Sequence, residues 1–362
     1  MALAPHQAVW LEGLLGALPA EEPLATCSDC AMLCGAESDP RGLGTFDPAI
    51  KCCTYLPELH NFLVGGALED QDPGGAEGRA TLEARIDAGV AVTPLGLGRP
   101  RAYDVLYRSQ AAGDFGRTGS FRCPHYLADG RCGVWRHRES TCATWFCKHE
   151  RGKAGADAWR SIHRLLGAAE RALARHCLLE LDLGPEALEL CLTAPQAPGL
   201  DGVHEPAAQR ALWGRWAGRE RAFYRACHGL AREVSWERLL SLGGVELQGL
   251  ARLAVAAQAR LSAPLPERLR PGCWQVAEAG PRTTRVITYS PIDPLELPTL
   301  LLEVLHLFAG RSVPEALEAI RTARGVRLTP ALVQRLVDFR LLVPAAAPEE
   351  QPSLPISSAP PL

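Results

Sequence analysis

Residues 123–147 read CPHYLADGRCGVWRHRESTCATWFC, and the four cysteines of this stretch decide how the first part of the chain is organised. The spacing is Cys-Pro-x7-Cys-x9-Cys-x4-Cys, with the cysteines at Cys123, Cys132, Cys142 and Cys147. Five more cysteines lie upstream, at Cys27, Cys30, Cys34, Cys52 and Cys53. Cysteines that recur so closely are typical of a metal site, since four thiolates at about 2.3 Å complete a tetrahedral zinc site and similar spacings hold iron–sulfur clusters.

The number of cysteines favours iron–sulfur slightly over zinc. Nine exceed the four that one zinc ion needs, and the adjacent side chains of Cys52 and Cys53 tend to diverge, which suits a multi-metal cluster or two separate sites. We therefore expect an iron–sulfur cluster, with 4Fe-4S favoured, or zinc. Sequence alone does not separate these metals, nor does it say which cysteines share one site.

Composition places the chain among ordinary globular proteins. It has 362 residues, 47% hydrophobic, with a formal net charge of −3, so the molecule as a whole has no electrostatic attraction to nucleic acid or to an anionic membrane. The apolar runs are interrupted by charge, and the first 20 residues lack the basic start of a secretory signal. We expect a cytoplasmic protein, where thiols stay reduced and cysteines serve metals or catalysis instead of disulfides.

Positive charge near the cysteines would stabilise a negatively charged centre. Residues 117–153 carry eight Lys or Arg against three Asp or Glu, and cations lower the pKa of neighbouring thiols. The alternatives for this stretch are a solvated surface or, at lower weight, a nucleic-acid patch.

Three histidines lie within five residues of cysteines, at His125, His137 and His149. Each is either a metal ligand, a hydrogen-bond partner of a ligand, or a packed or surface imidazole. Trp135, Trp145 and Phe146 are expected to pack as a dry shell around the site.

The rest of the chain predicts a mainly α-helical protein with an irregular, loop-rich metal-binding domain. The expected units are an N-terminal helix or extension (1–24), the cysteine-cluster domain (25–153), a helical domain (154–269), a small α+β module (270–345) and a disordered tail (346–362). Within 25–153, Pro- and Gly-rich sequence predicts long loops around one helix near Leu82. The helical pattern after 154 buries one face, formed by Trp159, Ile162, Leu166, Leu173 and Cys177.

Four cysteines are left out of the ligand set. Cys177 and Cys227 fall on apolar helix faces and are expected in the core, and Cys191 and Cys273 lie far from other cysteines in the sequence.

The C-terminal module shows clear helix signals. A strand is expected over 285–290 and an apolar helix over 294–309. Ser312 and Glu315 predict a capping box for a helix ending near Gly325, and Thr329 with Pro330 predicts a final helix.

The residues Cys123-Pro-His-Tyr-Leu, Cys132-Gly-Val-Trp-Arg-His-Arg138 and Cys142 resemble the YkgJ-type cysteine-cluster family, whose signature contains C-P, then C-x-[IV]-[YW]-x-x-R and a further Cys. That resemblance implies a zinc- or iron-chelating domain related to the flagellin lysine N-methylases. Two departures are an Arg138-Glu139 step in place of Arg-Pro, and 17 residues between Cys34 and Cys52. Blocks 51–65 and 144–152 look like signatures of a bacterial branch, and the C-terminal module is similar to PqqD-like or winged-helix-like modules.

Three functions follow as alternatives. The first is a metal-cluster protein whose centre is structural or transfers electrons. The second is an enzyme that modifies a protein or peptide by methyl transfer or redox chemistry, with the C-terminal module gripping the substrate; common nucleotide and metalloprotease motifs are absent from the sequence. The third is a zinc-ordered regulator that reads DNA through Arg335 and Arg340 of the last helix. A protein or peptide is thus an expected partner, while a membrane is not and nucleic acid has little support.

Overall fold

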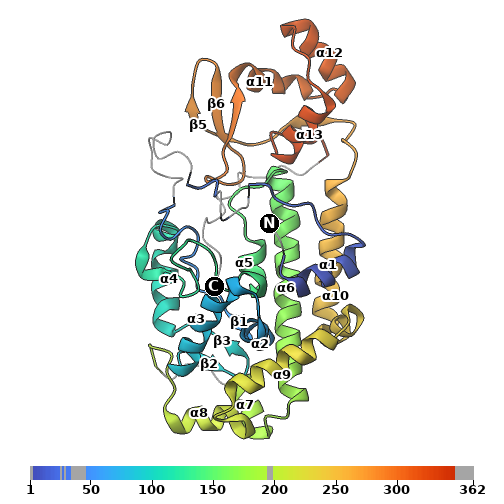
Figure 1. Ribbon diagram of the computed structural model, residues 1–362. Helices are drawn as coiled ribbons and strands as arrows, with labels where there is room; N and C mark the ends of the chain where they lie inside the picture. Colours follow the sequence, from blue (N-terminus) through green and yellow to red (C-terminus); the bar gives the residue numbers. More distant parts are fainter. Residues whose placement is uncertain (1–2, 25–26, 28–29, 34–45, 194–198, 347–362) are drawn as a thin grey trace.

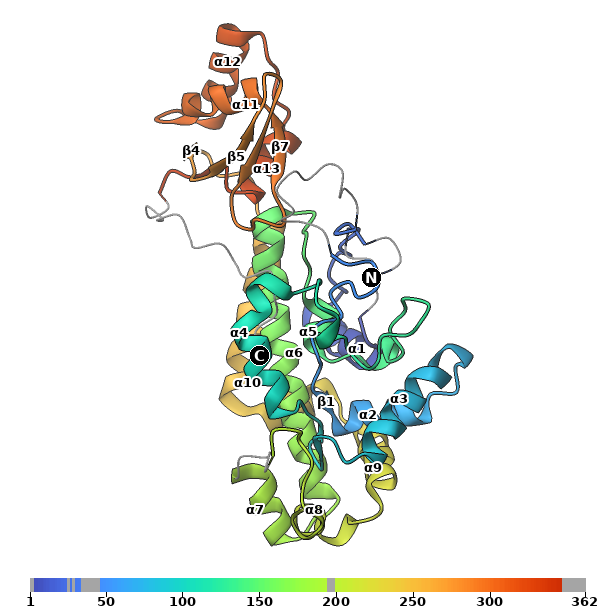
Figure 2. The same ribbon diagram turned by 90° about the vertical axis from the view of Figure 1, so that its left-hand side faces the viewer.

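One long helix, α6 (Gly152–Glu180), runs through the middle of the molecule. In this computed structural model the structure describes residues 3–24, 27, 30–33, 46–193 and 199–346. The helix buries residues around most of its circumference, and α10 (Trp236–Leu261) packs along it (Figures 1 and 2). The predicted inward face is confirmed, because Trp159, Ile162, Leu166, Leu173 and Cys177 are all buried.

The protein is mainly helical, with small antiparallel sheets. The remaining helices of the larger part are α1 (Pro5–Leu15), α2 (Asn61–Glu69), α3 (Ala76–Asp87), α4 (Arg101–Asp114), α5 (Ser140–Thr144), α7 (Pro185–Thr193), α8 (Pro206–Trp213) and α9 (Glu220–Glu233). Short 3-10 helices are η1 (Pro73–Gly75), η2 (Gly119–Phe121), η3 (Trp135–His137) and η4 (Gly214–Trp216). A three-stranded sheet in the order β1-β3-β2 joins β1 (Leu59–His60), β2 (Val92–Thr93) and β3 (Gly96–Leu97).

A single hydrophobic core joins the cysteine-rich segment to the helical segment. Leu63 and Val64 of α2 lie in the same core as Leu166 of α6 and Phe223 of α9, and Trp10 of α1 belongs to it as well. The segment 25–153 is therefore ordered partly by apolar packing against the helices that follow it in the sequence.

Three helices in the cysteine-rich segment were not predicted. The helix near Leu82 is present as α3, but α2, α4 and the short α5 also form. Helix α2 escapes a periodicity search because it is buried on nearly all sides and contains two glycines. A side chain at Gly65 would meet the carbonyl oxygen of Tyr224 at 1.9 Å, so glycine here lets α2 lie directly against α9.

The C-terminal module lies beyond the N-terminal end of α6 (Figure 2) and has its own hydrophobic core. Its elements are β4 (Leu269–Pro271), β5 (Gln275–Ala279), β6 (Thr283–Ile287), β7 (Leu295–Pro298), α11 (Thr299–Val304), the 3-10 helix η5 (Leu305–Phe308), α12 (Val313–Arg324), α13 (Pro330–Asp338) and β8 (Leu342–Pro344). Strands β5, β6 and β7 form an antiparallel meander, and β4 pairs with β8.

Most of the predicted signals in this module are confirmed. The capping box of Ser312 and Glu315 starts α12, Gly325 ends it in a left-handed conformation, and the Thr329 side chain caps α13. The predicted apolar helix over 294–309 is wrong at its start, because Leu295–Pro298 pairs with β6 as strand β7. A short apolar run fits a strand and a helix equally well. The predicted tail at 346–362 lies almost wholly outside the described residues.

One described helix, α10, is long and apolar enough to cross a membrane by length and composition. Its Leu239 and Leu247 are buried in the shared core, whereas Val245 is 87% exposed on the outer face. A core helix of a soluble protein passes the same test, so a single helix of this kind is weak evidence for a membrane protein.

The central role of α6 predicts a large effect of shortening one buried side chain. Leu166→Ala should lower the free energy of unfolding by about 2–5 kcal/mol, because Leu166 is fully buried and its loss leaves a cavity. Leu179→Ala is the matched control on the same helix; with a side chain 59% exposed, it should change the free energy by less than about 0.5 kcal/mol. Urea denaturation measures both, and equal losses would contradict the buried position of Leu166.

Candidate metal centre

Residues 123–133 form a small hairpin that holds two cysteines near each other. Tyr126 and Cys132 form an antiparallel bridge, and the backbone N–H of Gly133 donates to the carbonyl oxygen of His125 at 2.8 Å. The turn closes through Gly130, which has a positive φ of 81° that suits glycine. Cys123 and Cys132 thereby lie on opposite strands of the same hairpin.

The upstream cysteines reach this hairpin through the backbone. The N–H of Cys123 donates to the carbonyl oxygen of Cys53 at 2.7 Å, which joins the two cysteine groups directly. Lys51 adds a second connection, since its ammonium donates to the carbonyl oxygens of Cys27 at 2.7 Å and Gly130 at 3.2 Å. Segments separated by about 70 to 100 residues in the sequence therefore meet at one place.

Helix α5 presents the last two cysteines. The Glu139 carboxylate caps this helix by accepting from the N–H groups of Thr141 at 2.6 Å and Cys142 at 2.9 Å. Cys142 lies within α5, and Cys147 follows it in the extended segment that leads to α6. The cap fixes where Cys142 stands relative to the hairpin.

Seven thiols line one cavity of about 80 Å³, those of Cys27, Cys52, Cys53, Cys123, Cys132, Cys142 and Cys147. Cys30 lies next to this group, close enough to interact electrostatically with Cys52 and Cys147. Cys34 lies outside the described residues. The thiols of Cys52 and Cys53 do not diverge as expected, because they hydrogen-bond each other and face the same cavity. Within the described residues, no three Cys, His, Asp or Glu side chains are grouped as they would be around one bound metal ion.

Burial makes these thiols hard to ionise. It raises the pKa of Cys27 and of Cys123 to about 12, and it also raises the pKa of Cys142 and Cys147. Cys52 is the exception, because a hydrogen bond from Cys53 is the main cause that lowers its pKa to about 7. Apart from Cys52, the donor set is thus a group of neutral thiols that would release protons on binding a cation.

Arg138 is the basic residue of the 117–153 stretch that lines the cavity. It is 3% exposed, stacks on the Trp135 ring at 3.5 Å and donates to the carbonyl oxygens of Trp135 at 3.0 Å and Cys142 at 3.1 Å. Its guanidinium favours the thiolate form of several surrounding cysteines, among them Cys27 and Cys132. Trp135 and Trp145 line the same cavity, as expected. Phe146, the third residue expected in this shell, is not among the described lining residues and packs instead against the Trp159 ring of α6.

The structure gives different surroundings to the three histidines whose roles the sequence left undecided. His125 is fully buried and lines the cysteine cavity, where burial lowers its pKa to about 3 and keeps it neutral. The His137 ring bonds the Asp70 carboxylate at 3.1 Å, and the His149 ring lies 3.3 Å from the Tyr289 hydroxyl of the C-terminal module. Neither of those two lines the cavity among its described residues.

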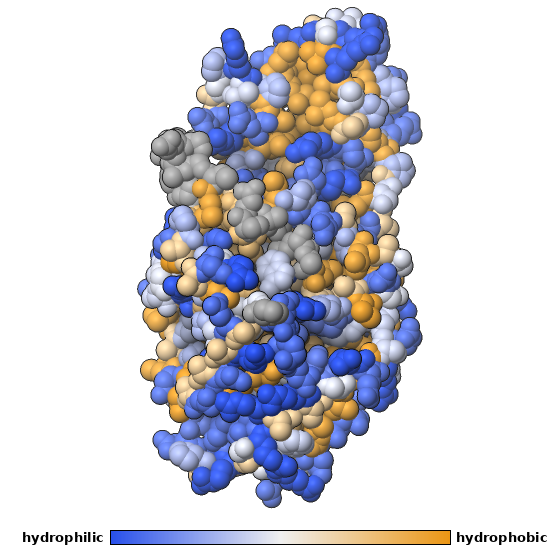
Figure 3. Space-filling view, viewed as in Figure 1, coloured by the Kyte–Doolittle hydropathy of each residue, from blue (hydrophilic) through white to orange (hydrophobic). Residues whose placement is uncertain are grey.

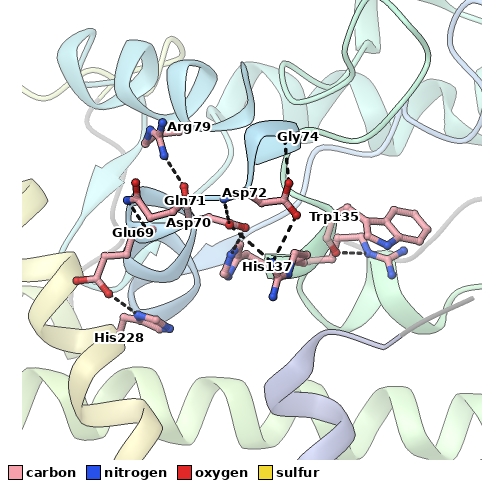
Figure 4. Close-up of polar contacts among 11 residues, drawn as sticks. Glu69, Asp70, Gln71, Asp72, Gly74, Arg79, Trp135, His137 and His228 are labelled. Atoms are coloured by element: carbon pink, nitrogen blue, oxygen red, sulfur yellow. Dashed lines mark hydrogen bonds and ion pairs between the residues drawn. The ribbon is translucent and has the colours of Figure 1, made fainter. Parts of the chain in front are cut away.

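A surface cleft of about 660 Å³ adjoins the cavity, and Cys27, Cys132 and Trp135 line both. Figure 4 shows one wall of this cleft, where Asp70 of the loop after α2 lies toward His137. The cleft brings solvent and solutes to two of the seven thiols.

Charges along the cleft are mixed. Arg136 lies 3.6 Å from Asp72 and 3.8 Å from Asp70, and Arg131 is 2.5 Å from Asp129. A ligand there would meet both signs of charge rather than a field of one sign.

The segment after Cys147 fastens the cysteine region to the C-terminal module. The N–H of His149 donates to the Asp293 carboxylate at 3.1 Å, and that carboxylate also accepts from the Tyr289 hydroxyl. Two residues later, Arg151 forms an ion pair with Asp338 of α13. The residues directly after Cys147, the last cysteine of the cavity, are thus bonded to the C-terminal module.

Sequence reasoning overlooked Lys51, Glu139 and the cleft. Arg138 occupies the arginine position of the quoted family signature, so the sequence could have singled it out as a residue of the site. Counting all charges over 117–153 together did not distinguish it from the other basic residues. Glu139 stands where the family signature has proline. An acidic residue directly before a helix that starts at Ser140 is a common helix cap, so its capping role could have been predicted.

A buried carboxylate pair stands behind α5. Glu170 of α6 accepts from the N–H of Ser140 at 3.0 Å and from the Gln7 amide at 2.8 Å, and it lies next to Glu139. Burial, together with the negative charge of Glu170, raises the pKa of Glu139 to about 7. The folded state therefore holds a proton on Glu139 at a pH where the unfolded chain, with an ordinary value of 4.5, has released it.

This difference predicts a pH-dependent effect of Glu139→Gln. As pH rises from about 4.5 to about 7, the wild type loses the stability that proton binding gives, by up to roughly 3 kcal/mol, and the variant does not. The variant should therefore gain stability relative to the wild type over this range in urea denaturation at pH 5, 6 and 7. Glu12→Gln, an exposed carboxylate on α1, should follow the wild type. A constant difference between variant and wild type across the range would contradict the raised pKa.

Comparison of the chain with protein-family models, with curated proteins and with solved structures finds no match.

Proposed function

We propose that the cavity holds a metal centre bound by cysteine thiolates, an iron–sulfur cluster with 4Fe-4S favoured or else zinc, and that this centre is the functional part of the protein. One observation carries the proposal: seven thiols from four separate stretches of the chain line a single buried cavity. Stability alone gives no reason to collect so many thiols, because apolar side chains of similar size would pack as well.

The chemistry of the donors suits both metals. Thiolates are soft ligands that bind zinc and iron–sulfur clusters, and a neutral imidazole suits the same ions. Cations stand near the thiols to offset their negative charge once they ionise. Arg138 favours ionisation of Cys142, Lys51 that of Cys52, and Lys148 that of Cys147.

The arrangement of the thiols favours a cluster over one ion. Four thiolates around a single zinc ion converge on one point at about 2.3 Å, whereas seven thiols from four stretches of the chain line this cavity. In a cluster each thiolate binds its own iron and sulfides separate the irons, so the ligands stand apart around an enclosed space. The cavity of about 80 Å³, against the roughly 10–15 Å³ that one water molecule needs on the same measure, fits that description. Zinc remains the alternative.

A bound cluster would supply one-electron transfer or a structural crosslink. The chain's own residues set the conditions for either role. Arg138 and the rings of Trp135 and Trp145 surround the thiols, while the adjoining cleft gives a redox partner or substrate access to Cys27 and Cys132. A thiolate centre needs reduced thiols, which suits the proposed cytoplasmic location, and no described cysteine forms a disulfide.

A second candidate is an enzyme that modifies a protein or peptide held by the C-terminal module. Strand β5 has a single described neighbour and is exposed along most of its length, so an extended peptide could add to its edge. Figure 3 shows a broad apolar area on this module. Val276 of β5 and Leu300 of α11 are exposed apolar side chains of the module. The PqqD-like interpretation belongs to this candidate. Saturable binding of S-adenosylmethionine in equilibrium dialysis would support methyl transfer, and absence of binding by the metal-loaded protein would count against it.

The DNA-reading alternative has less support. Helix α13, the expected recognition helix, packs against α6, with Arg335 near Glu150 at 3.5 Å and Asp338 paired with Arg151. A helix held in this way does not present a free basic face to a DNA groove.

The proposal predicts metal in protein purified without oxygen. Iron with acid-labile sulfide and absorption near 400 nm would establish a cluster, whereas zinc without sulfide would establish the alternative. Protein that contains neither metal, even after reconstitution with iron and sulfide or with zinc, would refute the proposed function.

Matched cysteine variants test the location of the centre. Cys123→Ser should lose most of the metal and lower the melting temperature, because metal-binding free energy contributes to folding. Cys227→Ser replaces an equally buried thiol that lies against Cys177 in the helical core, and it should keep the wild-type metal content. Full metal content in Cys123→Ser would remove Cys123 from the ligands.

A further inference from the structure

One histidine shares the cysteine cavity. His125 stands between Cys123 and Cys132 on the hairpin, is 0% exposed and lines the cavity with the seven thiols. The backbone holds it there, since its carbonyl oxygen accepts from Gly133 and its N–H supports the thiolate form of Cys123.

Hydrogen bonds determine which ring nitrogen of His125 carries the proton. Nδ1 lies 2.7 Å from the hydroxyl oxygen of Thr81 on α3. That hydroxyl has one proton, and it donates this proton to the carbonyl oxygen of Gly78 at 2.6 Å. Thr81 must therefore accept from His125, so Nδ1 bears the hydrogen and Nε2 has a free lone pair.

The lone pair on Nε2 has no described partner. The atom is buried, and no hydrogen bond to it exists within the described residues. A buried acceptor left unsatisfied destabilises the folded state, so this position needs either a donor or a metal ion. The nearest competing explanation is a water molecule bridging Nε2 to Arg85, whose Nη1 is also buried without a described partner.

We propose that Nε2 of His125 is a nitrogen ligand of the metal centre, so that the centre is bound by cysteines and one histidine. This inference rests on the proposed function and deepens it. Histidines that bind metals usually donate their other N–H to a fixed acceptor, which sets the tautomer and the ring orientation. Thr81 fills this position for His125. A histidine ligand raises the reduction potential of an iron–sulfur centre relative to a ligand set of cysteines alone.

The first test uses the unaltered protein, so it does not depend on a variant folding. The chain is produced with 15N-labelled histidine, loaded without oxygen and reduced, and the hyperfine coupling of nitrogen to the paramagnetic cluster is measured by pulsed electron paramagnetic resonance. If the metal is zinc, X-ray absorption at the zinc edge measures the ratio of nitrogen to sulfur ligands. We expect a directly bound histidine nitrogen in either case.

Three variants locate that nitrogen. His125→Ala should lose the nitrogen signal, and His125→Cys should keep the metal with an all-sulfur shell and, for a cluster, a lower potential. Thr81→Val removes the acceptor for Nδ1 and should release metal to a chelator about 10- to 100-fold more readily. His149→Ala is the matched control, since His149 also lies two residues from a cavity cysteine but has its ring against Tyr289. It should leave the nitrogen signal unchanged.

The outcomes separate this inference from the proposed function. Metal with an all-sulfur shell in the wild type would overturn the histidine ligand and leave the metal centre standing. A nitrogen signal that persists in His125→Ala would assign the ligand to another residue and would also overturn the inference. Protein without metal would overturn both.

Discussion

Burial of helix α6 is the constraint on which the rest of the structure depends. Its apolar side chains contact helices on several sides, and its one fully buried carboxylate, Glu170, ties down elements from distant parts of the chain. Glu170 accepts from Gln7 of α1 and from the backbone of Ser140 at the start of α5, so the same side chain positions the N-terminal helix and the helix that presents Cys142. A buried carboxylate is stable only when hydrogen bonds of this kind surround it. The centre of the molecule and the edge of the cysteine cavity are therefore fixed by one set of contacts.

The cysteine cavity, which rests on α6 and its contacts with α1 and α5, lowers the stability of the folded state. Polar sulfur, nitrogen and guanidinium groups are withdrawn from water around the cavity, although apolar side chains of similar size would pack there at lower free energy. Close backbone approach brings the parts together: a side chain at Gly78 of α3 would meet the carbonyl oxygen of Gly133 at 1.7 Å. That contact places Thr81 beside the hairpin that carries His125. Glycine at these two positions thus determines how near α3 lies to the cavity.

Local signals in the sequence foretold local structure well. The caps at Ser312 and Thr329 are short-range chemistry, and they define helices α12 and α13 as expected. The same holds for the apolar period of α6. Features that depend on distant contacts were not accessible: α2 forms because Gly65 fits against Tyr224, and β7 forms because β6 is available to pair with it. The sequence predicted the cysteines, an aromatic shell and His125 as one possible ligand, but not which of them share one cavity. Its members, Arg138 and His125 included, are defined by a fold that joins residues about 100 positions apart, which spacing alone does not encode.

The contact between the two ends of the shared core has a consequence for how the protein is made. Trp10 and Leu11 of α1 pack in the same core as Trp236 and Leu239 of α10, which leave the ribosome more than 220 residues later. At about 5–20 residues per second, the N-terminal segment waits on the order of ten seconds or longer before its packing partners exist. The thiols of Cys27, Cys52 and Cys53 are exposed to the surrounding solution at least until the hairpin and helix α5, which complete the cavity up to Cys147, have been synthesised. Closure of the shared core must follow synthesis of α10, so until then the cavity lacks the full support of that core.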